Sequence, residues 1–271
     1  MLLPAYHKGA LVTPDGAQIP FVAIGDGPLP VVVIPGGSDG VATVAESAPF
    51  LAWLYRRRAQ THRLLLLSRR QPIPGGYRVE QYADDFFWAM VQLGWENAIL
   101  ECNSAGGPIG QHMAAQRPDR VSGLILSNTA HRIDEQARAV ILHWKVLTQQ
   151  RRWAEFNWSV LEHTLRPQYL PRYRLLRPLL GWLNRPRHPE RLSRIFEGLL
   201  TVDNRAILPR IACPTLIVGG EDDLVFNALL QKEMAALIPR SRLSLYPGYG
   251  HINVQESPDY KLEMTTFMRA A

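Results

Sequence analysis

The chain has 271 residues, of which 46% are hydrophobic and 20% charged, as expected for one large globular domain with a substantial core. No apolar run approaches the roughly 18 residues of a membrane span. The first residues show no secretory signal, so we expect a cytoplasmic protein. The formal net charge is +6, but no nucleic-acid-binding motif accompanies it, and we expect no nucleic-acid partner.

Two cysteines, Cys102 and Cys213, lie far apart in the chain and do not have the spacing of a metal site or a disulfide framework. We therefore expect two buried free thiols and no bound metal.

The first elements are a hairpin and a series of buried strands. Residues 11–13 and 19–24 flank the turn Pro14-Asp15-Gly16, and residues 30–34 form a continuous apolar run that stops at Pro35-Gly36-Gly37. Such a run is typical of a strand that is buried on both faces, as in parallel sheets. Similar runs follow at residues 64–67, 98–100, 124–126 and 216–218, with an edge strand at 243–246.

Helical patterns separate these strands, at residues 47–55, 82–93, 107–116 and 227–237, with Asn227 as a candidate N-cap. Strands that alternate with helices predict an α/β fold, with a mostly parallel central sheet covered by helices on both faces. Right-handed crossovers then bring the carboxyl ends of the strands to one edge, where sites form in such folds.

The alternation stops between residues 130 and 209, which contain no strand-like run. This segment is rich in aromatic residues, and prolines divide it into short helical stretches. We expect residues 130–209 to form a helical cap (lid) inserted between two strands, with residues 1–129 and 210–271 as the core domain. Most of the aromatic side chains should form the core of the cap.

The predicted cap is also basic. It carries 14 Lys and Arg against 7 Asp and Glu, so the rest of the chain is close to neutral. This surplus of positive charge could serve to bind anionic ligands or surfaces. The simpler interpretation is that the arginines only lie on solvated helix faces.

Ser104 lies in Cys102-Asn103-Ser104-Ala105-Gly106, between the predicted strand at 98–100 and the helix at 107–116. A nucleophilic serine on a tight strand-turn-helix elbow needs small residues two positions before and after it. Gly106 meets this requirement and Cys102 meets it approximately. The alternative is an ordinary N-cap serine.

A serine hydroxyl needs a base to take its proton and a third group to orient that base. Asp222 and Asp223 follow the strand at 216–218, and either carboxylate could orient a histidine. His251 follows the edge strand in a glycine-rich loop, a context that the other seven histidines lack. The three candidate groups therefore come from three strand ends.

An oxyanion needs backbone N–H donors aimed at the developing charge. The flexible Pro35-Gly36-Gly37 segment can supply one amide, and Ala105, directly after the serine, can supply a second.

Nearly the whole chain resembles the α/β-hydrolase superfamily, in its capped serine esterase-like branch. The resemblance is carried by the PDG hairpin, IPGG, CNSAGG, CPTLIVGGEDD and YPGYGHINVQESP. It implies the order nucleophile, acid, histidine, and points to Asp223 rather than Asp222. It also implies that Gly37 supplies the first oxyanion amide.

Three features depart from the pattern of the family. Pro35-Gly36 stands where relatives have His-Gly, Cys102 replaces the first glycine of the elbow, and residues 68–72 (SRRQP) replace an Asp-x-x-Gly loop. Arg69 or Arg70 could bind a substrate carboxylate or form a structural ion pair, and we prefer the structural interpretation.

We therefore expect a serine hydrolase of small to medium carboxylic esters, with no cofactor, that acts as a monomer or homodimer. Gly36, Asn103, Trp144 and Trp158 are expected to line the substrate pocket. A serine nucleophile argues against the dehalogenase and epoxide-hydrolase branches, which the resemblance associates with aspartate. Two alternatives remain: a hydrolase of a lactone or of the carbon–carbon bond of a dienoic diketone, and a noncatalytic ligand-binding member of the fold.

Overall fold

A single mixed sheet organises the computed structural model, which describes residues 3–271. Within these residues the sheet has eight strands in the order β1-β2-β4-β3-β5-β6-β7-β8. The antiparallel pairs are β1 with β2 and β2 with β4, and every other neighbouring pair is parallel. The strands are β1 (Tyr6–Val12), β2 (Gln18–Ile24), β3 (Leu29–Ile34), β4 (His62–Leu67), β5 (Ala98–Asn103), β6 (Val121–Ser127), β7 (Thr215–Gly220) and β8 (Ser241–Tyr246). All eight overlap the strands predicted from the sequence.

Helices cover both faces of this sheet. On one face, Val31 and Val33 pack with α1 (Ala48–Tyr55) and α10 (Pro258–Ala270). On the other, Val32 and Ile34 belong to a larger core that includes α2 (Val79–Gln92), α3 (Gly107–Gln116) and α9 (Ala228–Leu237). The alternation within β3 is the two-residue period of a strand, and it explains why these strands are apolar throughout. The predicted fold class is confirmed.

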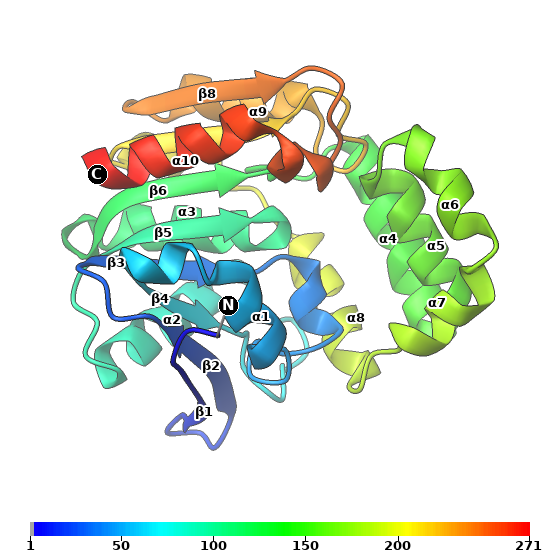
Figure 1. Ribbon diagram of the computed structural model, residues 1–271, viewed down its shortest axis with the longest axis horizontal. Coiled ribbons are helices and arrows are strands. Elements are labelled where there is room, and N and C mark those ends of the chain that lie inside the picture. The colour runs from blue at the N-terminus through cyan, green and yellow to red at the C-terminus, as the bar shows by residue number, and fades with distance from the viewer. Residues whose placement is uncertain (1–2) are drawn as a thin grey trace.

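Five further helices lie between β6 and β7 in the chain: α4 (Glu135–Gln149), α5 (Trp153–Thr164), α6 (Leu170–Arg174), α7 (Arg177–Leu183) and α8 (Pro189–Leu199). In Figure 1 the arrowheads of β5, β6 and β8 point toward α4–α7. Helix α5 packs on α7, and α8 packs both on α4 and on the short helix η1 (Gly37–Gly40) that follows β3. We refer to α4–α8 as the cap. Its boundaries at residues 130 and 209 stay a prediction.

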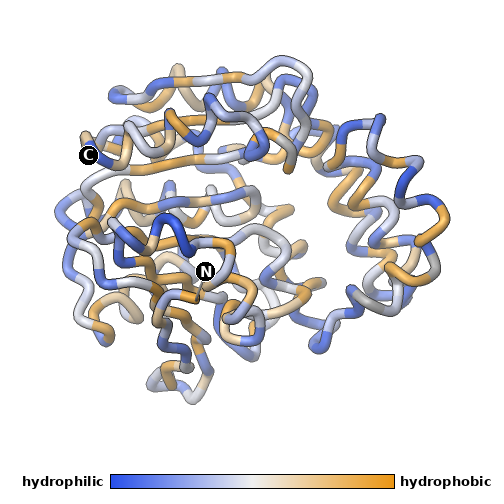
Figure 2. Tube along the Cα trace, in the orientation of Figure 1, coloured by the Kyte–Doolittle hydropathy of each residue, from blue (hydrophilic) through white to orange (hydrophobic). Residues whose placement is uncertain are grey.

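Aromatic residues hold the cap together. Four of them are buried, and their rings form a chain of contacts in the order Trp153, Phe156, Phe196 and Trp144. Figure 2 shows hydrophobic residues concentrated along the central strands and on parts of the cap helices. The cap core is continuous with the larger core of the sheet, so burial of apolar area fixes the cap over one edge of the sheet.

Local signals account for the starts of α9 and α2. Asn227 is the N-cap of α9, and its side chain accepts a hydrogen bond from the Leu230 N–H. Helix α2 begins three residues before its predicted start, where the Gln81 side-chain oxygen accepts a hydrogen bond of 2.9 Å from the Arg78 N–H. Helix α10 was not predicted.

Both cysteines are buried and free, as expected. No helix within residues 3–271 is long and apolar enough to cross a bilayer.

Candidate active site

Ser104 follows β5 directly and has a backbone φ of +50°. A non-glycine residue in this left-handed region is strained, and such strain concentrates at functional sites. The turn is tight because two glycines follow: a Cβ on Gly106 would lie 2.4 Å from the Ile34 carbonyl oxygen, and one on Gly107 would lie 2.0 Å from Thr129 Oγ1. The Thr129 hydroxyl in turn donates to the Ser104 carbonyl at 2.6 Å. Close packing thus presents the serine at the end of β5.

Cys102, which replaces the first elbow glycine, fits because of a third glycine. A Cβ on Gly110 would lie 2.2 Å from Cys102 Sγ, so the thiol occupies the space that a side chain on α3 would otherwise fill. The thiol is fully buried, and burial raises its pKa well above the usual value. Cys102 is therefore a packing residue here, without the thiolate character of a reactive cysteine.

Three side chains from three strand ends meet in a line. His251 Nε2 lies 2.9 Å from Ser104 Oγ, and His251 Nδ1 lies 2.8 Å from Asp223 Oδ2. His251 and Asp223 are buried, whereas Ser104 is half-buried. A serine, a base and an orienting carboxylate in hydrogen-bond contact form the geometric signature of an activated nucleophile.

The two neighbouring aspartates differ in their surroundings. Asp223 Oδ1 accepts hydrogen bonds from the backbone N–H groups of Val225 and Phe226, which leaves Oδ2 directed at the histidine. Asp222 is exposed. The structure therefore brings Asp223, and not Asp222, into contact with His251.

The loop after β3 lies against the serine. A Cβ on Gly36 would lie 2.9 Å from Ser104 Cβ and 3.5 Å from Ser104 Oγ, so only glycine permits this approach. Gly37 begins η1 at this point, and Ala105 follows the serine within the short helix η3 (Ser104–Gly106). Both predicted oxyanion donors thus belong to segments that touch at Ser104.

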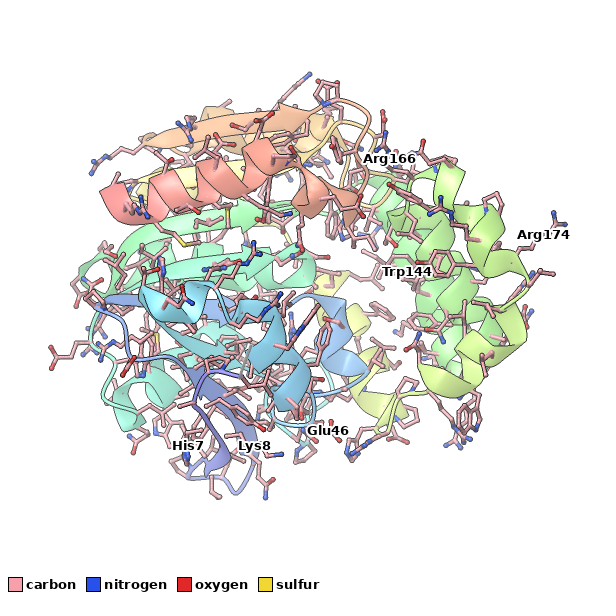
Figure 3. All side chains as sticks on the ribbon, in the orientation of Figure 1. His7, Lys8, Glu46, Trp144, Arg166 and Arg174 are labelled. Carbon is pink, nitrogen blue, oxygen red and sulfur yellow. The ribbon has the colours of Figure 1, made fainter. Side chains whose placement is uncertain are left out.

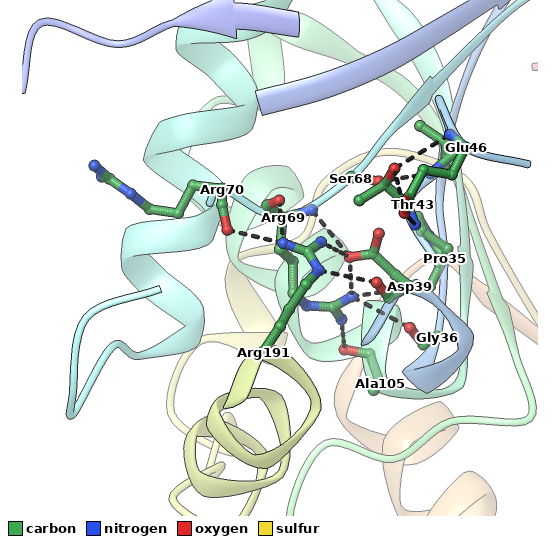
Figure 4. A network of polar contacts seen from close by, with 11 residues as sticks. Pro35, Gly36, Asp39, Thr43, Glu46, Ser68, Arg69, Arg70, Ala105 and Arg191 are labelled. Atoms are coloured by element: carbon green, nitrogen blue, oxygen red, sulfur yellow. Dashed lines mark hydrogen bonds and ion pairs between the residues drawn. The ribbon is translucent and has the colours of Figure 1, made fainter. Parts of the chain in front are cut away.

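Arg69 ties these two segments together (Figure 4). Its Nη1 donates to the carbonyls of Pro35 and Gly36, both at 3.2 Å, and its Nη2 donates to the Ala105 carbonyl at 2.9 Å. The side chain is 2% exposed. One planar guanidinium therefore fixes the spacing of the two backbone segments that carry the candidate oxyanion amides.

A cap residue joins the same network. Asp39 Oδ2 lies 3.2 Å from Arg69 Nη1 and 2.7 Å from Arg191 Nη2, with all three side chains buried. Arg191, on α8, also donates to the backbone carbonyls of Asp39, Arg69 and Arg70. Figure 4 shows the cap and the loop after β3 joined through Asp39.

Arg70, the other candidate for binding a substrate carboxylate, lies elsewhere. It forms ion pairs with Asp15 and Asp85 and donates to the Tyr77 hydroxyl at 3.0 Å. Arg69 and Arg70 both make internal ion pairs, as the structural interpretation predicted.

The residues expected to line the pocket have different positions. Gly36 and Asn103 adjoin Ser104. Trp144 lies on the side of the cap toward the core in Figure 3, and its ring centroid is 6.1 Å from that of Phe196. Trp158 donates to Glu162 at 2.6 Å and lies under the guanidinium of Arg177, so these contacts are within the cap.

Two aromatic residues near the site were not singled out from the sequence. A Cβ on Gly37 would lie 4.0 Å from Phe196 Cε1 on α8, and the ring centroid of Phe226 lies 5.7 Å from that of His251. Their patterns in the sequence resemble those of ordinary core aromatics, and only the packing of α8 and of the loop after β7 brings them here. Asp39 and Arg191 were also missed, because their contact depends on the packing of α8 against η1.

Comparisons with known proteins agree with the fold. A family model described as "alpha/beta hydrolase fold" matches residues 30–258. "Putative carbamate hydrolase RutD" of Klebsiella pneumoniae subsp. pneumoniae is 28% identical over 237 residues, which cover 82% of this chain and 84% of that protein. "3-oxoadipate enol-lactonase 2" of Acinetobacter baylyi is 27% identical over 188 residues, 68% of each chain. Among solved structures, the alpha/beta hydrolase MGS-M2 from a Medee basin deep-sea metagenome library has a TM-score of 0.82 at 18% identity, with 97% of this chain and 98% of that chain covered.

Proposed function

The chain belongs to the alpha/beta hydrolase fold family, and we propose that within it the protein is a serine hydrolase that cleaves small to medium carboxylic esters. The observation that carries this proposal is the continuous chain of contacts from Ser104 through His251 to Asp223, at 2.9 and 2.8 Å. A ligand-binding protein has no need of this alignment.

In the proposed reaction, His251 Nε2 removes the proton from the Ser104 hydroxyl as its oxygen attacks the carbonyl carbon of the ester. The Asp223 carboxylate accepts the His251 Nδ1–H and stabilises the imidazolium that forms. His251 then gives the proton to the departing alcohol. Water, activated by the same histidine, releases the carboxylic acid from the acyl-enzyme and restores the serine.

The charge on the tetrahedral intermediate is stabilised by the N–H groups of Gly37 and Ala105. Such donors act through preorganisation, and the loss of one typically costs a factor of about 10²–10³ in rate. The contacts of Arg69 with both segments support this role. Arg69 and Arg191 together exceed the charge of Asp39 by one positive unit, which also favours an oxyanion in a buried site.

The cap is proposed to close the acyl side of the site. The ring of Phe196 lies near Gly37 and contacts the ring of Trp144 in the cap core. An apolar acyl group bound beside Gly37 would therefore contact aromatic rings. The groups that the mechanism uses come from a single chain, which is compatible with the expected monomer or homodimer.

A lactone is the second candidate substrate, because one relative in the comparison bears the name of an enol-lactonase. Ester and lactone hydrolysis need the same nucleophile, base and oxyanion donors. They differ in whether the leaving alcohol stays attached to the acid.

The experiment compares wild type, Ser104→Ala and Ser122→Ala on a panel of p-nitrophenyl esters and small lactones. Ser122 is the matched control, because it lies near the start of β6, at the amino ends of the parallel strands, whereas Ser104 lies at their carboxyl ends. We expect Ser104→Ala to lose at least about 10³-fold in kcat while Ser122→Ala retains activity. Equal activity in both variants would contradict the proposed nucleophile, and turnover of lactones alone would favour the second candidate.

A further inference from the structure

The outer end of the cap, which we call the cap tip (residues 169–187), exposes large apolar side chains. Leu175, between α6 and α7, is 91% exposed, and Trp182 on α7 is 74% exposed. Leu176 and Leu179 are exposed beside them. Figure 2 shows hydrophobic and hydrophilic residues side by side along this edge of the molecule. A cluster of exposed leucine and tryptophan side chains is unusual on a protein surface that faces only water.

The same segment carries charge of one sign. Between residues 169 and 187 there are five arginines and no aspartate or glutamate. Arg174 projects away from the molecule at its outer edge in Figure 3. Within residues 3–271, neither Arg174 nor Arg185 forms an ion pair. Arg174 and Arg185 therefore lack the internal acidic partners that Arg69, Arg70 and Arg191 have, whereas Arg187, at the end of the tip, pairs with Glu46.

A hollow in the surface adjoins the exposed tryptophan. Its lining includes Arg151, Arg152, Glu155, Trp182 and Arg185. Arg152 is engaged by Glu155, whereas Arg151 and Arg185 make no ion pair within the described part of the chain. Cationic groups thus stand beside an aromatic side chain at the point where α7 meets the start of α5.

We propose that the cap tip docks on anionic phospholipid surfaces, with Leu175 and Trp182 inserted among the headgroups and the arginines paired with phosphates. Interfacial segments combine apolar side chains and tryptophan with Lys or Arg in this way. Tryptophan settles at the level of the headgroups, and each basic residue adds attraction to an anionic surface. The inference is independent of the proposed ester hydrolysis.

Two other occupants fit less well. A second copy of the chain, placed on this face by a two-fold axis, would bring arginines against arginines with no acidic residue in the segment to separate them. An acidic protein would satisfy the arginines, but it would also need an apolar groove for Leu175. A bilayer surface supplies both the anionic charge and the apolar interior.

The test is co-sedimentation of the full chain with vesicles of phosphatidylcholine mixed with phosphatidylglycerol, and with vesicles of phosphatidylcholine alone. We expect binding to the mixed vesicles, weakened by added salt and much weaker on phosphatidylcholine. Leu175→Glu and Arg174→Glu should each lower the partition coefficient on the order of fivefold or more. Equal binding to both kinds of vesicle, or to neither, would overturn the proposal.

The matched controls are Leu262→Glu, at an exposed leucine on α10, and Arg117→Glu, at an exposed arginine that follows α3, outside the cap. Both should bind vesicles as wild type does, and an unchanged thermal midpoint verifies that each variant folds. Poly-L-glutamate serves as a polyanion without an apolar layer. Binding to it that matches vesicle binding and is unaffected by Leu175→Glu would overturn insertion. A dimer that Leu175→Glu dissociates would also overturn the proposal.

Discussion

The guanidinium of Arg69 donates a hydrogen bond of 2.9 Å to the carbonyl of Ala105, the residue that follows Ser104. Its other terminal nitrogen bonds the carbonyls of Pro35 and Gly36. Arg69 therefore stands behind both sides of the candidate oxyanion hole. The loop that carries proline in place of the histidine of the family pattern thus obtains its hydrogen-bond support from a side chain on the neighbouring strand end.

Replacement of Arg69 by Met is expected to lower kcat by about 10- to 100-fold with a smaller change in KM. The amides of Gly37 and Ala105 would lose the fixed spacing that oxyanion stabilisation needs. Steady-state kinetics on a p-nitrophenyl ester measures this. Arg70→Met is the control, because Arg70 bonds Asp15, Tyr77 and Asp85 instead. Equal losses of kcat in the two variants would show that Arg69 has no special role in positioning.

Arg191→Met should lower the free energy of unfolding by about 3–5 kcal/mol, because it leaves the buried backbone carbonyls of Asp39, Arg69 and Arg70 without their donor. Chemical denaturation measures the change. Arg194→Met, on the same helix, removes only an exposed pair with Glu197 and should cost at most about 1 kcal/mol. Similar values for both variants would argue against a structural role for the buried network.

Under the proposed mechanism, Asp223→Asn should reduce kcat by about 10⁴-fold, because an amide holds the imidazole in the wrong tautomer. Asp222→Asn, one residue away and exposed, should change kcat less than about threefold. Kinetics of the two variants at neutral pH decides between the two carboxylates. A large loss in Asp222→Asn with activity kept in Asp223→Asn would reverse the choice.

Gly110→Ala should destabilise the protein by about 1–3 kcal/mol, since the new Cβ would lie 2.2 Å from Cys102 Sγ. The double variant Cys102→Gly/Gly110→Ala removes that thiol and should recover most of the loss. A double-mutant cycle on the free energy of unfolding measures this coupling. Additive effects of the two substitutions would show that Cys102 and Gly110 do not compensate each other.

The sequence predicted the sheet, and it placed Ser104, His251 and one of the two aspartates Asp222 and Asp223 at strand ends that share one edge, because both follow from local patterns. The choice of Asp223 came from the resemblance to the family. Buried strands have continuous apolar runs, and the carboxyl ends of parallel strands share one edge. Helix α10 could not be predicted from such patterns. Its buried residues are Tyr260, Met264 and Met268, one in every turn, between mostly polar neighbours. So narrow an apolar stripe barely differs from that of an irregular polar segment.

The network around Asp39 could not be predicted in the same way. Asp39 lies 30 positions before Arg69 and 152 before Arg191 in the chain. Which arginine reaches a buried carboxylate depends on how α8 packs against η1, and no local pattern encodes that packing. The sequence left the role of Arg69 open between a substrate carboxylate and a structural ion pair, because a basic residue at a strand end is compatible with both.

Peptide mapping by mass spectrometry after treatment with a fluorophosphonate tests the identity of the nucleophile most directly. This reagent forms a stable adduct with a serine that a neighbouring base activates. We predict one adduct per chain, on Ser104, formed by wild type and by Ser122→Ala and absent from Ser104→Ala. An adduct on any other residue, or no adduct on wild type, would contradict the proposal that Ser104 is the nucleophile.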